Sequence, residues 1–306
     1  EETTDEFSLG MITDEGGVDD RSFNQSAWEG MQAWAEEAGF SDDAVNYYQS
    51  DDPSQFVQNL NTAVQDGYDI IYGVGFQLKD AVSDVAGQNP DQHFGIVDEV
   101  IEADNVVSLN FEDNQAAYLA GVAAANTTQT DKVGFIGGVA GPVIDKFEAG
   151  FVEGVESVDP NIEIDIQYAE SFSDAAIGQQ IAAGMYSSGA DIIYHASGAV
   201  GNGVFTEATN RMESGSENQL WVIGVDRDQA ELGEWEEGNL TLTSTLKQVG
   251  TAIQLATERA REEGFPGGEN IIYGLEDDGV GITEGNMPEE AWTAVEEARK
   301  AIIDGE

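Results

Sequence analysis

Apolar runs and helically spaced apolar residues alternate along the whole chain. The run Phe7–Ile12 is typical of a buried strand. After a polar loop, apolar residues return at the spacing of a helix, at Ala27, Trp28, Met31, Ala35 and Ala38. This order of strand, loop and helix repeats to the end of the chain. It predicts an α/β fold in which helices cover mainly parallel sheets.

The same pattern places the remaining elements. The longer strands are predicted at Phe7–Ile12, Val45–Gln49, Asp69–Val74, His93–Asp98, Val106–Phe111, Lys132–Ile136, Ile162–Tyr168, Asp191–Ala196, Leu220–Asp226 and Leu240–Leu246, with short strands near Ile271–Leu275 and Gly279–Ile282. Helices are predicted at Phe23–Glu37, Pro53–Gln65, Leu78–Gly87, Asn114–Ala125, Pro142–Val158, Ser173–Ser187, Asn202–Arg211, Val249–Glu263 and Pro288–Ile303.

The two halves of the chain resemble each other. Asp69-Ile-Ile-Tyr72 matches Asp191-Ile-Ile-Tyr194, and each is followed by a glycine-bearing loop, a helix and an apolar strand that ends in aspartate, Asp98 or Asp226. We therefore expect two similar α/β lobes that face each other across a cleft. Because no Pro- or Ser-rich linker separates them, short crossings are expected near 108–111 and 243–247. The expected lobes are approximately residues 1–109 with 247–266, and 110–246 with 267–306.

The charge balance narrows the classes of partner. The chain has 60 Asp and Glu residues against 11 Lys and Arg, a net charge of −49. Nucleic acid is disfavoured as a partner, because phosphate binding needs clustered basic residues. Disorder is excluded by the 41% hydrophobic share and the repeated apolar strands. A strongly acidic surface repels itself less when salt screens it, so we infer a hypersaline source.

Neither a membrane-spanning helix nor a signal peptide is visible in the sequence, and cysteine is absent. No apolar run approaches the roughly 18 residues of a membrane helix. The chain opens with acidic and polar residues, Glu1–Glu6, so we expect a mature form or a trimmed chain rather than a signal peptide. The absence of cysteine excludes disulfides and thiolate chemistry.

The loop from Thr13 to Gly30 carries the first candidate site. It joins a predicted strand to a predicted helix, and open α/β sheets bind ligands at that edge. Ser22 is a suitable N-cap, which places Phe23 and Asn24 in the first helical turn. Phe23 could project into a cleft, and Asn24 could read a heteroaromatic edge with one acceptor and two donors. The alternative is that Phe23 is a hydrophobic staple and Asn24 a turn former.

Three acids share one position in the predicted sheets. Asp14, Asp98 and Asp226 stand at the carboxyl ends of apolar strands, where a carboxylate could bind vicinal hydroxyl groups through charge-assisted hydrogen bonds. In so acidic a chain, some acids must fall at strand ends by chance. Chance explains any one of them more easily than all three.

Two further residues are candidates in the second half. Lys247 ends a predicted strand and could aim at a ligand oxygen; otherwise it forms a surface ion pair. Phe172 lies after a strand and before a helix, in a pattern that mirrors Ser22-Phe23-Asn24. Two such phenylalanines could stack on both faces of a flat ring. The alternative for Phe172 is a buried staple. His195 closes a strand, where a packed role is the commoner one.

Catalytic motifs do not stand out. Gly137–Gly141 lacks the spacing of a dinucleotide fingerprint and is followed by no P-loop lysine. Asp226–Ala230 begins like a calcium loop but has Glu231 where the turn glycine is needed. We see no nucleophile–base pair. Neither a catalytic residue nor a metal site nor a cofactor is therefore expected.

The loop sequence resembles a known family. Residues 13–30, Thr-Asp-Glu-Gly-Gly-Val-Asp-Asp-Arg-Ser-Phe-Asn-Gln-Ser-Ala-Trp-Glu-Gly, are similar to the opening signature of the basic membrane lipoprotein family, the substrate-binding components of ABC importers best known for purine nucleosides. Further similar segments are Gly73–Phe76, Phe94–Asp98, Ala117–Gly121, Val133–Gly138, Ala196–Gly198, Gly201–Val204 and Val225–Asp226.

The resemblance implies a type I periplasmic-binding-protein fold, with two Rossmann-like lobes, three crossovers, a hinge and an interlobe cleft. It implies that Phe23 and Phe172 stack on a purine whose edge meets Asp14 and Asn24. The ribose would meet Asp98, Asp226, Lys247 and a glycine of the Gly198–Gly201 loop. The family's lipid-bearing cysteine is absent, so a membrane anchor would have been removed with the start of the precursor.

The resulting hypothesis is a monomeric solute-binding protein at the extracellular face of the cell membrane. It would capture a nucleoside, expected to be a purine one, and deliver it to the permease of an ABC transporter. Alternatives are the same fold with a sugar, a flavin or a signalling molecule as ligand, a nucleotide-dependent enzyme, and a ligand-sensing regulator. The enzyme lacks a visible phosphate loop, and the regulator lacks a basic DNA-binding segment before the first strand.

Overall fold

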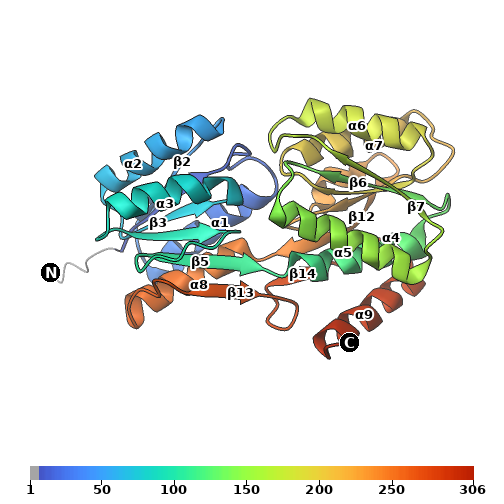
Figure 1. Cartoon of the computed structure of the whole chain (residues 1–306). Helices are drawn as coiled ribbons and strands as arrows, with labels where there is room; N and C mark the ends of the chain where they lie inside the picture. Colours follow the sequence, from blue (N-terminus) through green and yellow to red (C-terminus); the bar gives the residue numbers. More distant parts are fainter. Residues whose placement is uncertain (1–6) are drawn as a thin grey trace. The chain divides into compact units, whose positions relative to one another are not determined.

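The computed structural model describes residues 7–306, so the acidic opening Glu1–Glu6 lies outside the described residues. The chain divides into two compact units (Figure 1). The first contains residues up to Phe111 together with Gln248–Tyr273, and the second contains Glu112–Lys247 and Gly274–Glu306. The second segment of the first unit reaches Tyr273 rather than residue 266, because a strand at Asn270–Tyr273 pairs with Val106–Phe111.

The first unit is built on a parallel sheet. Its strands are β1 (Leu9–Thr13), β2 (Val45–Tyr48), β3 (Ile70–Val74), β4 (His93–Val97), β5 (Val106–Phe111) and β13 (Asn270–Tyr273). Their order is β13-β5-β4-β3-β1-β2, and every neighbouring pair is parallel. Because all strands share one direction, all of their carboxyl ends lie at one edge.

Helices cover this sheet on both faces, as the apolar strands require. They are α1 (Phe23–Ala38), α2 (Phe56–Asp66), α3 (Lys79–Gln88) and α8 (Val249–Glu262). Alternate residues of β3 show the two faces: Ile71 belongs to the core under α2 and α3, whereas the Tyr72 hydroxyl bonds the Thr257 hydroxyl of α8 at 2.8 Å. Helices α1 and α8 meet at Gly30, where a Cβ atom would lie 2.2 Å from the Cα of Gly250.

The second unit repeats the strand order of the first. Its strands are β6 (Lys132–Gly137), β7 (Glu163–Tyr168), β8 (Ile192–Ala196), β9 (Trp221–Gly224), β12 (Thr241–Lys247) and β14 (Val280–Ile282), in the order β14-β12-β9-β8-β6-β7. Only the β12–β14 pair of this sheet is antiparallel. A small hairpin of β10 (Glu234–Trp235) and β11 (Gly238–Asn239) was not predicted, because strands of two residues leave no pattern.

Five helices belong to the second unit: α4 (Asp113–Thr127), α5 (Pro142–Val158), α6 (Ala175–Ser187), α7 (Val200–Glu213) and α9 (Glu289–Ile303). Helix α4 is apolar on almost every side because α5, α9 and the sheet all pack on it. Helices α6 and α7 cover the opposite face of the sheet (Figure 1). The shared strand order confirms that the two halves are structural repeats.

Candidate functional site

Asp14 and Asp98 lie at the carboxyl edge of the first sheet. Asp14 follows β1 and Asp98 follows β4, and both are at least nine-tenths buried. Parallel α/β sheets bind ligands at this edge because loops and helix N-termini converge there. The structure therefore places both predicted acids where a ligand of the first unit would be expected.

The loop after Asp14 folds back onto it through the start of α1. The Asn24 side-chain amide donates to Asp14 Oδ1 at 2.7 Å, and the Asp14 N–H donates to Asn24 Oδ1 at 3.3 Å. The Gly16 N–H also donates to Asp14 Oδ1, at 2.8 Å. Asp14 and Asn24, which the family resemblance places at one base edge, are thus brought together.

Helix α1 begins at Phe23, as predicted, but Ser22 makes no side-chain cap. The buried carboxylate of Asp20 caps the first turn instead. It accepts hydrogen bonds from the N–H groups of Ser22 and Asn24 at 2.8 Å and from that of Gln25 at 3.1 Å. It also accepts a side-chain hydrogen bond from Asn24 at 3.0 Å. Asp20 was not predicted, because nothing in the sequence distinguishes this acid from the many surface acids of the chain.

Burial controls the electrostatics of this loop. Loss of solvent raises the pKa of the Asp14 carboxyl from 3.8 to about 7, although the hydrogen bonds from Asn24 and Gly16 act in the opposite direction. The charges of Asp20 and Glu15 raise that pKa further. Burial also raises the pKa of Asp20, against the four hydrogen bonds that it accepts. Two buried carboxylates in one loop are unusual for a purely structural turn.

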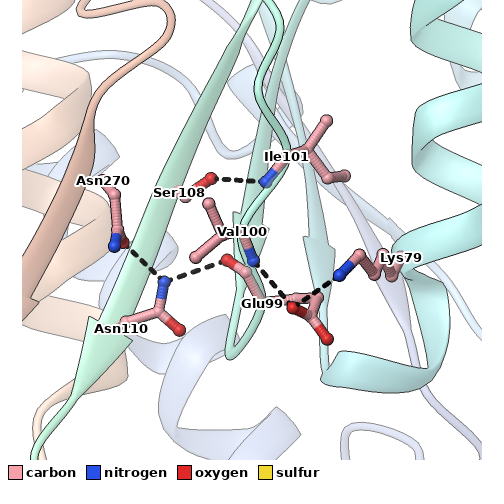
Figure 2. Close-up of polar contacts among 7 residues, drawn as sticks. All are labelled: Lys79, Glu99, Val100, Ile101, Ser108, Asn110 and Asn270. Atoms are coloured by element: carbon pink, nitrogen blue, oxygen red, sulfur yellow. Dashed lines mark hydrogen bonds and ion pairs between the residues drawn. The ribbon is translucent and has the colours of Figure 1, made fainter.

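Asp98 is held in a left-handed backbone conformation, with φ 71°, and its N–H donates to the Leu109 carbonyl at 2.9 Å. Figure 2 shows how the next residues are fixed. The Glu99 carboxylate accepts from Lys79 at 2.9 Å and from the Val100 N–H at 3.0 Å. The Glu99 carbonyl accepts from Asn110 at 2.9 Å, and Asn110 also donates to Asn270 at 2.7 Å. This network ties the loop to α3, β5 and β13.

Phe23 is the first residue of α1 and is only partly buried, whereas Ala27 and Met31 of the same helix are fully buried. A large aromatic ring that is partly exposed at the carboxyl edge of the sheet can stack on a flat ligand. Phe23 and Asn24 are the first two residues of α1, and the loop that begins at Asp14 leads into them.

The second unit contains the counterpart of Asp98. Asp226 follows β9, which occupies the sheet position of β4, and it has φ 69°. Its carbonyl accepts the N–H of Lys247, at the end of the neighbouring strand β12, at 2.8 Å. Asp98 also contacts its neighbouring strand, β5, but through its N–H, which donates to the Leu109 carbonyl. The repeat noted in the sequence thus extends to the backbone conformation of the two acids.

Lys247 is buried rather than part of a surface ion pair. Its side chain is 4% exposed, and its Nζ lies 3.2 Å from Asp113, whose side chain is 2% exposed. The ammonium group also lies 5.5 Å from the centre of the Phe147 ring. Asp113 was not predicted, because it is remote in sequence from Lys247.

Phe172 packs beside two glycines at the edge of the second sheet. A Cβ atom at Gly138 would lie 2.2 Å from the Phe172 ring, and Gly198, with φ 58°, lies beneath its backbone carbonyl. Phe172 is 8% exposed. It follows the second strand of its sheet by connectivity, β7, whereas Phe23 follows the first, β1. The two phenylalanines therefore occupy different positions of the repeat, although each lies between a strand and the start of a helix.

Gly201 lies inside α7, because this helix begins at Val200 rather than at Asn202. A Cβ atom there would lie 2.0 Å from Cε1 of His195, a fully buried side chain. His195 Nε2 contacts Gln229 Oε1 at 2.8 Å, and that oxygen accepts the Val225 N–H at 3.0 Å. Burial lowers the pKa of His195 to about 4, so the ring is neutral at neutral pH. Gly201 thereby makes room for a network that fixes the residues before Asp226.

A cavity of about 470 Å³ lies elsewhere in the second unit, at the carboxyl end of α7, lined by Met212, Glu213, Gly215, Ser216, Trp235, Glu236 and Glu237. It is at the opposite end of α7 from Gly201 and contains none of the predicted residues. Within residues 7–306, His, Asp and Glu side chains form no group of three or more that could hold a metal ion. No helix in that range is long and apolar enough to cross a membrane.

Curated relatives match almost the whole chain. It is 50% identical to the CD4+ T-cell-stimulating antigen of Listeria monocytogenes, over 98% of this chain and 87% of the relative. It is 46% identical to the ABC transporter nucleoside-binding protein BmpA of Lactococcus lactis, over 98% of this chain and 88% of the relative. These shares mean that the similarity extends over both units.

The fold matches solved structures. An ABC transporter solute-binding protein from Aeropyrum pernix superposes with a TM-score of 0.86 and 26% identity, over 98% of this chain and 92% of that one. The family model for PnrA-like ABC transporter substrate-binding proteins matches residues 7–305. The ligand of such a component is a small molecule and its partner a membrane permease. The chain therefore belongs to the PnrA-like family of ABC transporter substrate-binding proteins.

Proposed function

We propose that this substrate-binding protein binds a nucleoside, and that the base is a purine. The observation that carries the proposal is the connection between β1 and α1. A buried carboxylate, Asp14, stands at its start, and a partly exposed ring, Phe23, stands at its end. A carboxylate and an aromatic face are the two groups that a heteroaromatic base needs for recognition. The similarity to a relative named as nucleoside-binding, at 46% identity, supports the same class of ligand.

The other predicted residues receive roles in the same proposal. Phe23 and Phe172 would stack on the base, and Asp14 and Asn24 would bind its edge. Asp98 and Asp226 would accept hydrogen bonds from ribose hydroxyls, and their matched left-handed conformations support a shared task. Lys247, held by Asp113, would donate to a ribose oxygen. Backbone groups near Gly198 and Gly201 would complete the set. The hinge and the cleft between lobes stay predictions of the resemblance.

The wider setting is also part of the proposal. The protein would work as a monomer at the extracellular face of the cell membrane, held by a lipid anchor in its precursor, and would not bind nucleic acid. The net charge of −49 supports both the exclusion of nucleic acid and a hypersaline source. Assays should accordingly be run in multimolar salt.

Calorimetric titration of guanosine into the natural chain and into Phe23→Ala and Phe172→Ala tests the function. Loss of one stacking ring should weaken binding about 5- to 150-fold, since base–aromatic stacking contributes roughly 1–3 kcal/mol. Phe40→Ala is the matched control, because Phe40 lies just beyond the opposite end of α1 and is also partly exposed. Equal affinities in all four proteins would remove the stacking roles from the proposal.

A further inference from the structure

One histidine ring joins two loops at the carboxyl edge of the second sheet. His195 is the last residue but one of β8, and its side chain is fully buried. Its Nδ1 lies 3.1 Å from Ser197 Oγ, and its Nε2 lies 2.8 Å from Gln229 Oε1. Ser197 opens the loop after β8, and Gln229 closes the loop after β9, residues 225–229, called here the Asp226 loop. A single side chain therefore connects both loops.

The neighbours of the ring assign its proton. The Val225 N–H, which can only donate, donates to Gln229 Oε1 at 3.0 Å. Because this oxygen can only accept, Nε2 of His195 carries the proton that it receives. Burial lowers the pKa of His195 to about 4, so the ring is neutral and its Nδ1 accepts from the Ser197 hydroxyl. Both ring nitrogens are thus used inside the protein, and the ring acts on a ligand only through its neighbours.

The link through Gln229 continues to the backbone around Asp226. The Gln229 N–H donates to Ser244 Oγ of β12 at 3.0 Å, and the Asp226 carbonyl accepts the N–H of Lys247, also in β12, at 2.8 Å. The Asp226 loop is therefore tied to strands on both sides of β9. Asp226 needs this support, because its left-handed backbone, with φ 69°, is uncommon for a residue that has a side chain.

The first unit has no side chain for the same task. There, Asp69-Ile-Ile-Tyr72 is followed by Gly73, whereas Asp191-Ile-Ile-Tyr194 is followed by His195. The two positions correspond, because β3 neighbours β4 as β8 neighbours β9. A glycine cannot reach the loop of the next strand. The histidine is therefore a departure from the repeat, and it serves a requirement of the second unit.

Resting on the proposed function, we propose that His195 is a positioning residue for the recognition of ribose: through Gln229 it fixes the Asp226 loop, so that the Asp226 carboxylate is held where it accepts a hydrogen bond from a ribose hydroxyl. Such a charge-assisted bond is strong but depends steeply on distance and angle. The preference for a ribonucleoside over a deoxyribonucleoside should therefore depend on a histidine that contacts neither.

Titration of inosine, 2′-deoxyinosine and 3′-deoxyinosine into the natural chain and into His195→Leu, in multimolar salt, tests the inference. The natural chain should bind inosine roughly 10- to 150-fold more tightly than the analogue that lacks the hydroxyl held by Asp226. In His195→Leu this preference should fall several-fold, toward equal affinities. Tyr186→Phe is the matched control, because it removes a hydrogen bond to the Trp221 carbonyl at the opposite end of β9. It should leave the preference unchanged.

The outcomes separate the inference from the function. A full preference in folded His195→Leu, or a natural chain that binds all three nucleosides equally, would overturn the inference and leave nucleoside binding intact. Failure of the folded natural chain to bind inosine would overturn the proposed function itself. An equal loss of preference in Tyr186→Phe would show that general destabilisation explains the effect, and would also overturn the inference.

Further variants test the route through Gln229 and Asp226. Gln229→Leu breaks the link from the other side and serves as the test if His195→Leu does not fold; a preserved preference there would overturn the inference. Gln229→Glu keeps an oxygen that accepts both N–H groups, so much of the preference should return. In an Asp226→Ala background, His195→Leu should lower the preference no further, because the histidine acts through Asp226. A further decrease would overturn the inference.

Discussion

Lys247 and Asp113, separated by 134 positions in the chain, form a nearly fully buried ion pair with Nζ and the carboxylate oxygens 3.2 Å apart. The pair joins the last residue of β12 to the first residue of α4. Each charge compensates the other in a place where neither could be solvated. The backbone N–H of the same lysine donates to the Asp226 carbonyl at 2.8 Å.

Removal of one partner should be severe. Lys247→Met leaves the Asp113 carboxylate buried without its cation, so we expect a loss of about 3–5 kcal/mol in the free energy of unfolding. Urea unfolding at constant high salt measures it. The double variant Lys247→Met with Asp113→Leu should recover much of that loss, because it leaves no isolated charge. A loss for Lys247→Met within the error of the measurement would show that the pair is not structural.

The start of α1 should depend on Asp20. Asp20→Ala leaves three backbone N–H groups of the first turn without their acceptor, and we expect a loss of about 2 kcal/mol or more in stability. Asp19→Ala, which removes an exposed acid from the same loop, should change stability by less than about 0.5 kcal/mol. Equal effects of the two substitutions would contradict the capping role.

The pH dependence of stability should report on Asp14. Its pKa is about 7 in the folded chain and about 4 when exposed, so the folded state holds the proton over that range and loses stability as pH rises through it. Asp14→Asn cannot ionise. Without ligand, its unfolding free energy relative to the natural chain should rise by roughly 2 kcal/mol between about pH 5 and pH 8. A pH-independent difference would mean that Asp14 titrates normally.

Gly201 should tolerate no side chain. Gly201→Ala places a methyl group against His195, displaces its contact with Gln229, and should cost about 1–3 kcal/mol in stability. Gly184→Ala is the matched control in α6, where the position is exposed and has open space around it. It should stabilise the protein by about 0.5–1 kcal/mol, as helical alanine does. Thermal unfolding of both variants decides whether the His195 network needs this glycine.

Local patterns predicted most of the fold. Helix α5 has the predicted bounds, Pro142–Val158, because its apolar spacing and its N-terminal proline are both local signals. The strand at 220–226 was predicted too long: β9 ends at Gly224, since the left-handed backbone at Asp226 stops the pairing although Val225 is apolar. Helix α7 was predicted to begin too late, because its first residues include glycines that are packed against His195 and α6.

The candidate site was less accessible to sequence reasoning. Asp14 and Asn24 are ten residues apart, and only the family resemblance associated them before the structure showed their hydrogen bond. Asp20 and Asp113 could not be told from the other acids of the chain, because burial and not residue type makes them distinctive. The sequence likewise did not predict that the Asn24 amide donates to two carboxylates, because that depends on where Asp14 and Asp20 lie in space.

The most direct measurement for the whole account is calorimetric titration of the natural chain with guanosine, inosine and adenosine in multimolar salt, with ribose and glucose as controls and circular dichroism to verify folding. The account predicts saturable one-to-one binding of at least one purine nucleoside with a Kd well below about 1 mM, and much weaker binding of the free sugars. A folded protein that binds none of the three nucleosides, or that binds the sugars as tightly, would contradict it.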